Sequence, residues 1–279
     1  MFLGRLFALL AALASSGTPV FAQTLRDAGW SPWQVNAARS ALGFVLIALW
    51  LRSDLWLARK NPVGIAAMML VYLVGSSSYL YAVMHASMGT AVSVLYLSTG
   101  WVTLIQRLRG DPERYDVPAS VMLVVGVACV VGFGGPEDTW QGIAAAFVGS
   151  GMQCAFTLLG IKLTKTIPAT VVAAWGLLGG TVAFGWLMVA APWSAPGALV
   201  AVIGIGTVSG LAYLTLSTLA FSRIGHEARM WFPFDLVFIW IAQILWQGCL
   251  PSPASIAGVL LILFAALLLA WGKRHPPVP

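Results

Sequence analysis

A carboxylate lies two residues after a proline within a long apolar stretch, MWFPFDLVFIWIAQILWQG, which runs from Met230 to Gly248. An acidic side chain inside the hydrocarbon of a bilayer is costly unless it is solvated or paired, so Asp235 is expected to face a cavity or a partner. Pro233 has no amide hydrogen, so it leaves a carbonyl one turn earlier without its partner and kinks the helix. This combination is typical of a helix that lines a pathway, and it predicts a hinge at Pro233.

A second charge, Arg39, lies inside another apolar stretch, Pro32 to Leu51. Three interpretations of the two charges remain open at this point. Arg39 and Asp235 form a structural ion pair, or Arg39 binds helix-end carbonyls. Alternatively, Arg39 binds a substrate carboxylate and Asp235 binds a substrate amine or another cation. In the third interpretation Asp235 carries protons, because burial disfavours the charged form of a carboxyl group.

Other polar and aromatic side chains recur at spacings of three and four residues, which place them on common helix faces. Packing between helices explains a single Ser, Thr or Gly in such a pattern equally well, and it is the preferred explanation for the pair Gly206 and Gly210. It explains large or costly side chains less well. The further candidate substrate-binding residues are Ser78, Tyr81, Tyr96, Thr99, Trp101, Gln153, Tyr213, Trp231 and Phe238.

The elements that must position these residues are membrane helices. The chain is 59% hydrophobic and only 9% charged, with a mean hydropathy of +0.89, whereas soluble domains carry about 25% charged residues. Apolar stretches near the roughly 20 residues that a spanning helix needs predict an all-α membrane protein with ten transmembrane helices. The stretches cover about residues 2–23, 32–51, 63–84, 89–108, 117–133, 140–161, 168–190, 198–221, 230–248 and 254–271.

The basic residues alternate between successive connections. Of the 15 Lys and Arg residues, all but Arg26 and Arg39 fall in or next to connections on one side of the membrane. The positive-inside rule therefore places both termini in the cytoplasm and requires an even number of spans. The first stretch imitates a secretory signal that ends at Ala22, but we expect it to be retained as a helix, because the internal repeat described below needs it as its first member. The net charge of +6 follows from this topology, so no nucleic-acid partner is expected.

An internal repeat divides the chain into two halves, residues 1–136 and 137–279. PWQVNAARSALG from Pro32 aligns with PATVVAAWGLLG from Pro168 with half of the positions identical, and PAS at Pro118 aligns with PAS at Pro253 at nearly the same offset. Each half holds five predicted helices. Because five is odd, the second half enters the membrane from the opposite side, which is the inverted repeat of many alternating-access transporters.

Local sequence features add a family resemblance over essentially the whole chain. YAVMHASMGTAVSV from Tyr81 and SRIGHEARMWFPF from Ser222 form two similar hairpins, GVLLILFAALLLAW from Gly258 forms the last helix, and Arg39 lies in the second helix. These features resemble the EamA branch of the drug/metabolite transporter superfamily. The resemblance implies a central pathway lined mainly by helices three, four, eight and nine, with contributions from helices one and six. Helices five and ten would be peripheral.

The chain departs from the family pattern at two places. Ser98, Thr99 and Gly100 replace a proline expected in the fourth helix, and Gln247 replaces a glutamate often found at the end of the ninth. These departures concern the branch of the family and the substrate.

The sequence thus predicts a secondary transporter of a bacterial inner membrane that moves a small organic metabolite by alternating access. Export of an amino acid or a related zwitterion is the first hypothesis, because one buried cation and one buried anion suit such a ligand. The alternative substrate is an organic cation or drug held by Asp235 and aromatic faces. A membrane-embedded enzyme or a channel is the alternative class.

The expected partners are the small-molecule substrate, the lipid bilayer and protons as a coupling ion, with the chain as a monomer or homodimer. The three cysteines are scattered, and no metal spacing, phosphate-binding glycine loop or nucleophile–base pair is present in the sequence. We therefore expect no metal, no cofactor and no enzymatic activity.

Overall fold

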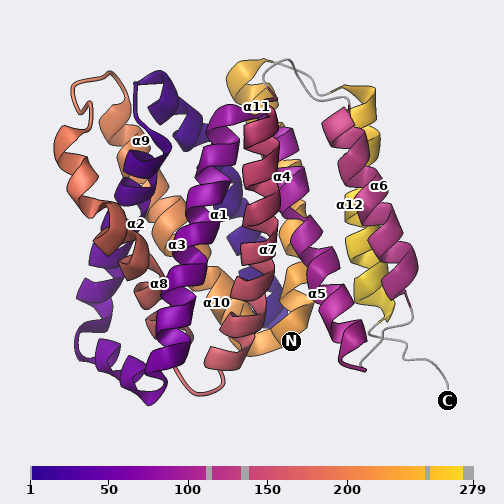
Figure 1. The fold of residues 1–279 in the computed structure, drawn as a ribbon, viewed down its shortest axis with the longest axis horizontal. Coiled ribbons are helices and arrows are strands. Elements are labelled where there is room, and N and C mark those ends of the chain that lie inside the picture. Colours follow the sequence, from indigo (N-terminus) through magenta and orange to yellow (C-terminus); the bar gives the residue numbers. More distant parts are fainter. Residues whose placement is uncertain (1, 111–114, 133–137, 249–251, 273–279) are drawn as a thin grey trace.

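The computed structural model describes residues 2–110, 115–132, 138–248 and 252–272, and in these ranges the chain is built from helices without strands (Figure 1). The α-helices are α1 (Phe2–Asp27), α2 (Pro32–Leu51), α3 (Pro62–His85), α4 (Met88–Leu95), α5 (Leu97–Leu108), α6 (Asp116–Gly132), α7 (Trp140–Leu163), α8 (Ala169–Phe184), α9 (Ala198–Gly204), α10 (Tyr213–Ile224), α11 (Asp235–Gln247) and α12 (Pro253–Gly272). Tighter or wider turns are η1 (Arg52–Lys60), η2 (Gly185–Ala190), η3 (Ile205–Ala212), η4 (Gly225–Met230) and η5 (Phe232–Phe234).

The lengths of these elements confirm an all-α membrane protein. Eight helical runs of the described residues are long and apolar enough to cross a membrane. Two shorter apolar runs, Asp116–Gly132 and Phe232–Leu245, occupy the places of the remaining two predicted segments. The count of ten spans and the inverted repeat stay predictions.

Capping residues and prolines set where the helices begin. Ser31 accepts a hydrogen bond from the amide of Gln34, whose side chain accepts from the amide of Ser31, so a capping box starts α2. Asn61 caps α3 immediately before Pro62, and Thr139 caps α7. Proline is favoured at the first helical position because its missing amide hydrogen would have no partner there.

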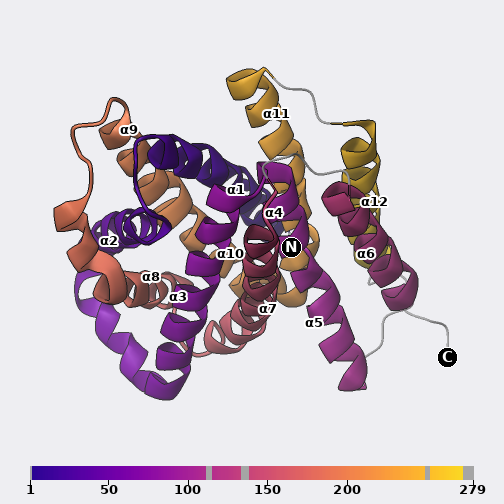
Figure 2. The same ribbon diagram turned by 45° about the horizontal axis from the view of Figure 1, so that its top comes forward.

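The helices pack as a main body with one peripheral pair. α1 lies inside the body against α10, α11 and η3, while α2 packs on α8 and α3 packs on α7. The pair α6 and α12 stands at one side (Figures 1 and 2). A Cβ atom added at Gly126 would lie 2.6 Å from the carbonyl oxygen of Gly258, and one at Gly258 would lie 2.5 Å from that of Gly126. Only glycine therefore permits the close approach of these two helices.

Three of the predicted segments contain irregular turns, two of them in the middle and the ninth near its start. The fourth breaks at Tyr96, between α4 and α5. The eighth contains the π-helix η3 between α9 and α10, and the ninth passes through the 3-10 turn η5, which contains Pro233, into α11. Pro233 thus lies in a turn directly before α11 and not inside a kinked α-helix, and its role as a hinge stays a prediction. Irregular backbone within a membrane is tolerated where it is buried in protein or lines a cavity.

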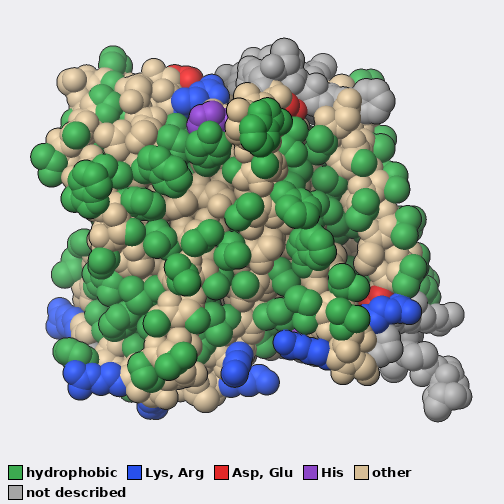
Figure 3. All heavy atoms as spheres, viewed as in Figure 1, with side chains coloured by type: hydrophobic (Ala, Val, Ile, Leu, Met, Phe, Trp, Pro, Cys, Tyr) green, Lys and Arg blue, Asp and Glu red, His purple; other side chains and the backbone are tan. Residues whose placement is uncertain are grey.

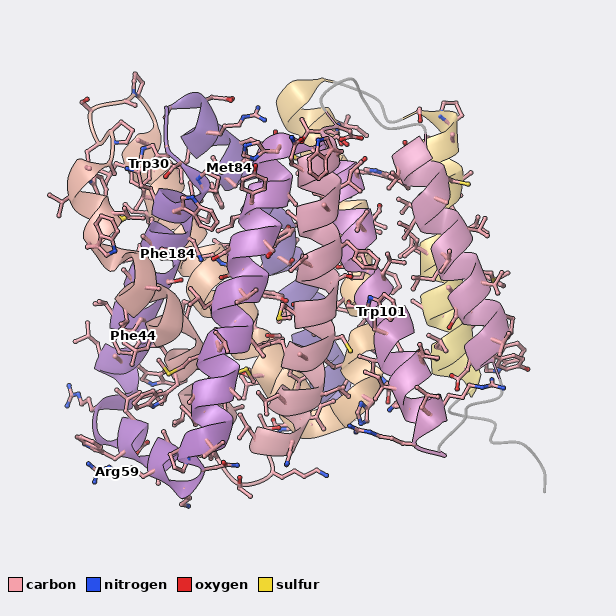
Figure 4. The ribbon with its side chains drawn as sticks, in the orientation of Figure 1. Trp30, Phe44, Arg59, Met84, Trp101 and Phe184 are labelled. Carbon is pink, nitrogen blue, oxygen red and sulfur yellow. The ribbon has the colours of Figure 1, made fainter. Side chains whose placement is uncertain are left out.

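The surface of the molecule has an apolar belt and one basic edge. Large hydrophobic side chains such as Leu49, Val182 and Leu245 are exposed around the body, as lipid contact requires. Figure 3 shows lysine and arginine side chains gathered along the lower edge of the view. In the same orientation Arg59 lies at that lower edge, and Met84 lies near the opposite edge (Figure 4). This asymmetry agrees with the charge alternation along the sequence.

Candidate substrate-binding site

Asp235 is the first residue of α11 and is only 1% exposed. Its Oδ2 atom accepts a hydrogen bond of 3.1 Å from the Ser15 hydroxyl of α1. Its Oδ1 atom has no hydrogen-bond partner among the described residues. Asp235 is therefore a buried carboxyl group with unused capacity to accept hydrogen bonds.

Arg39 lies in α2 and is 3% exposed. Its Nε and Nη2 atoms both donate to the backbone carbonyl of Ser209 in η3, at 3.4 and 3.3 Å. The guanidinium carbon lies 5.6 Å from the ring centre of Tyr72 and 5.9 Å from that of Tyr213, within the range of cation–π attraction. A guanidinium has five N–H donors, so the carbonyl leaves donors of Arg39 available to a carboxylate.

The structure distinguishes the two forms of the first interpretation, in which the charges have a structural role only. The ion pairs present in the described residues are Arg5–Glu227 and Arg26–Asp27. The hypothesis of a direct ion pair between Arg39 and Asp235 is therefore wrong. The bond to a backbone carbonyl is correct, although that carbonyl belongs to a π-helix and not to a helix end.

Glycines bring α2 and η3 close enough for this bond. A Cβ atom at Gly210 would collide with the carbonyl oxygen of Arg39, and one at Gly206 would lie 2.6 to 2.8 Å from atoms of the Leu42 side chain. The pair is thus a packing surface, as expected. Its close approach places the Ser209 carbonyl within reach of Arg39.

The two charges lie in two neighbouring cavities. The Arg39 cavity is lined by Ser15, Thr18, Arg39, Val71, Tyr72, Gly75, Ser76, Tyr79, Leu95, Met152, Gln153, Phe156 and Tyr213. The Asp235 cavity is lined by Ala12, Ser15, Leu95, Tyr96, Ser98, Thr99, Val102, Gln153, Thr157, Tyr213, Phe232 and Asp235. About 40 Å³ of the first and 20 Å³ of the second are open to the centres of water-sized molecules. Each has room for water in this conformation and is narrower than a metabolite requires.

Six of the predicted site residues come together around these cavities. They are Arg39, Tyr96, Thr99, Gln153, Tyr213 and Asp235. They come from α2, α7, α10, α11 and the broken pair α4 and α5, so segments far apart in the sequence meet at one place.

Two predicted residues on α3 line neither cavity. Ser78 lies near Gly149 of α7, and Tyr81 stacks on His85 at a ring distance of 4.0 Å. The expected face of α3 is therefore corrected. The face that lines the Arg39 cavity carries Tyr72, Gly75, Ser76 and Tyr79.

The expectation that Trp101 faces the central pathway is also corrected. Trp101 lines a groove between α5 and α6, and the open space of about 460 Å³ in that groove is bordered mainly by apolar side chains. Its indole Nε1 donates to the Ser150 hydroxyl of α7 at 3.2 Å, and its ring meets Phe147 edge to face. Figure 4 shows Trp101 on α5, on the side of the body nearest the pair α6 and α12.

Two predicted residues of the ninth segment also line neither cavity. Trp231 stacks on Phe234 and lies 5.9 Å below the Arg5 guanidinium, near the end of the body. Phe238 is partly exposed, one turn after Asp235. Phe232, whose carbonyl accepts a 2.8 Å hydrogen bond from the Tyr96 hydroxyl, takes the expected aromatic place in the Asp235 cavity.

Two residues of α1 that are not among the predicted site residues make polar contacts at the site. Ser15 binds Asp235, and Thr18 donates to the Ser209 hydroxyl at 2.6 Å. The spacing of three between Ser15 and Thr18 gives them a common helix face, which is the signal that could have identified them. Helix α1 therefore contacts Asp235 directly and, through Ser209, the residue whose carbonyl binds Arg39.

Polar contacts also join separate elements at the two ends of the body. Near the start of α1, Arg5 and Glu227 form an ion pair of 2.7 Å. At the end where α3 stops, Asp138 accepts hydrogen bonds from the amide of Ser87 at 2.6 Å and from the hydroxyl of Thr90 at 2.7 Å. The narrow cavities thus lie between two ends of the body at which polar contacts hold separate elements together.

Comparisons with known proteins give the class of the protein. The model of the EamA-like transporter family matches residues 2–132, which confirms the resemblance to the drug/metabolite transporter superfamily over that stretch. The match indicates a membrane transporter of the drug/metabolite kind. No curated protein sequence matches the chain.

The fold has a counterpart among solved structures. One crystal structure superposes with a TM-score of 0.76 over 98% of this chain and 98% of its own, at 17% sequence identity. At that identity the likeness concerns the fold alone.

Proposed function

We propose that this protein is a secondary transporter that exports an amino acid or a related zwitterion across a bacterial inner membrane by alternating access. The substrate carboxylate binds Arg39 and the substrate ammonium binds Asp235. Both termini lie in the cytoplasm, as the positive-inside rule indicates from the alternation of basic residues between connections.

One observation carries this proposal. Two buried opposite charges lie in adjoining cavities without being paired to each other. Buried charges are normally paired, because desolvation of an unpaired charge is expensive. Here Arg39 is bonded to a neutral carbonyl and Asp235 to a neutral hydroxyl. A zwitterion would supply the missing opposite charge to each of them.

The packing of the helices supports alternating access between two inverted halves. When the five segments of the first half are exchanged with those of the second, α3 on α7 becomes α10 on α1, and α3 on α8 becomes η3 and α9 on α2. The contacts of α2 with α8 and of α6 with α12 exchange with themselves. Such a pattern is expected of a pseudo-two-fold axis, and broken helices at its centre are typical of transporter binding sites.

An organic cation is the second candidate substrate. The Asp235 cavity contains the aromatic side chains of Tyr96, Tyr213 and Phe232, and aromatic faces attract cations. A cation would use Asp235 and leave Arg39 bonded to its carbonyl.

Flux into proteoliposomes tests the proposal. Purified protein should give saturable, chemically unchanged transport of at least one of the twenty standard amino acids, and Arg39→Gln should abolish it. Transport of amines that survives Arg39→Gln, with no amino-acid flux in the wild type, would support the cation alternative. Chemical conversion of the solute would indicate an enzyme.

A further inference from the structure

A wall of four residues separates the Arg39 cavity from the Asp235 cavity. Ser15, Leu95, Gln153 and Tyr213 line both cavities. Across this wall the Gln153 side-chain amide donates a hydrogen bond of 3.2 Å to the Tyr213 hydroxyl. The wall therefore contains one hydrogen bond that joins α7 to α10.

Tyr213 connects this wall to an irregular part of the backbone. Tyr213 is the first residue of α10 and directly follows the π-helix η3, an irregular type of turn that is frequent at functional sites. Its ring also faces the Arg39 guanidinium at 5.9 Å. A shift of Tyr213 would thus change the Arg39 surroundings and open the wall together.

A ligand that bridges the two charges must displace this wall. The two cavities offer about 40 and 20 Å³ to the centres of water-sized molecules, and a zwitterion touching both Arg39 and Asp235 has to pass between Gln153 and Tyr213. Breaking their hydrogen bond leaves buried polar groups unpaired, which is unfavourable. A monoamine that binds Asp235 alone leaves the hydrogen bond intact.

We propose that Gln153 and Tyr213 are specificity-determining residues whose hydrogen bond divides the binding site until a ligand bearing both a carboxylate and an ammonium replaces it. The inference rests on the proposed function and names the residues that would distinguish a zwitterion from a ligand with a single charge. The wall opens for a ligand that makes two charge-assisted contacts, since these offset the broken hydrogen bond. Ligands with a single charged group gain one such contact and occupy one cavity.

Binding measurements on purified variants test the division. The twenty standard amino acids are titrated calorimetrically against the wild type, and the tightest is compared with its decarboxylated amine. Tyr213→Phe keeps the ring and removes the hydrogen-bond acceptor, and Gln153→Met keeps the length and removes the donor. Each should tighten amino-acid binding by roughly 2- to 10-fold, the worth of one net hydrogen bond, and should change the amine affinity less, so that the ratio of amino-acid to amine affinity rises.

A double variant and a matched comparison sharpen the result. Tyr213→Phe combined with Gln153→Met should tighten binding no more than either single change, because both remove the same bond. Tyr72→Phe makes the same chemical change in the Arg39 cavity, but the Tyr72 hydroxyl has no hydrogen-bond partner in the described part of the chain. It should shift the ratio of amino-acid to amine affinity less than Tyr213→Phe does. Thermal melting of each variant verifies that it is folded.

The outcomes separate this inference from the proposed function. If the wild type binds none of the amino acids, or binds the amine as tightly as the amino acid, the proposed function fails. If it prefers the amino acid but both wall variants bind it equally well or more weakly, the division is overturned. In the weaker case Gln153 and Tyr213 are direct ligand contacts instead. If a wall variant does not fold, the other variant decides.

Discussion

Replacing Asp235 with asparagine removes a buried negative charge while keeping the size of the side chain. The carboxylate is 1% exposed, with one oxygen bonded to Ser15 and the other without a hydrogen-bond partner in the described residues. Because an incompletely paired buried charge destabilises a fold, Asp235→Asn should keep or raise the melting temperature. Its cost is expected in function.

The size of that cost follows from the contact that is lost. A hydrogen bond to a charged group contributes about 1.5–3 kcal/mol. If Asp235 binds the substrate ammonium, the dissociation constant of Asp235→Asn should rise by about 10- to 150-fold. The rise should appear at every pH at which the wild-type carboxyl group is ionised.

Calorimetric binding and proteoliposome flux, both over a pH series, distinguish the two functional roles. In the substrate-binding role, affinity and flux fall together. In the proton-carrying role, binding survives while flux driven by a pH gradient disappears. Wild-type affinity and wild-type flux at every pH would refute both roles and leave Asp235 as a structural residue.

Three further predictions concern Arg39, the ion pair between Arg5 and Glu227, and Trp101. Arg39→Gln should weaken the binding of carboxylate-bearing ligands by at least about 10-fold but leave amine binding intact. Its effect on melting temperature should add to that of Asp235→Asn, because the two charges are not paired. Strong non-additivity would indicate that Arg39 and Asp235 do form an ion pair. Glu227→Gln removes the ion pair with Arg5. In a protein without its native cysteines, it should speed the maleimide labelling of a cysteine placed at Ala12 when the reagent is added on the side where α1 begins. Unchanged labelling would show that the ion pair does not hold that end closed. Trp101→Phe should lower the melting temperature slightly through its lost hydrogen bond without changing ligand affinity, and a large loss of affinity would return Trp101 to the pathway.

The amino-acid sequence alone determined the helix plan of this protein. Runs of apolar residues bounded by prolines and capping side chains fix where helices start, because backbone hydrogen bonds in a bilayer must be satisfied within the segment. The burial of Asp235 and Arg39 follows from their positions inside apolar stretches. The packing role of Gly206 and Gly210 was also predicted from the sequence.

Tertiary structure alone decided which helix faces meet. A helix that is apolar all round gives no hydrophobic face to distinguish the protein interior from lipid, so spacing on α3 grouped Ser78 with Tyr81 while packing turned Tyr72 and Tyr79 inward. For the same reason the sequence led to the expectation that Trp101 faces the pathway. In the structure Trp101 lines the α5–α6 groove and its indole is bonded to Ser150. The contact of Ser15 with Asp235 and the wall between the two charges depend on pairs of residues far apart in the sequence. No local pattern specifies such contacts, because they arise only when separate helices pack together.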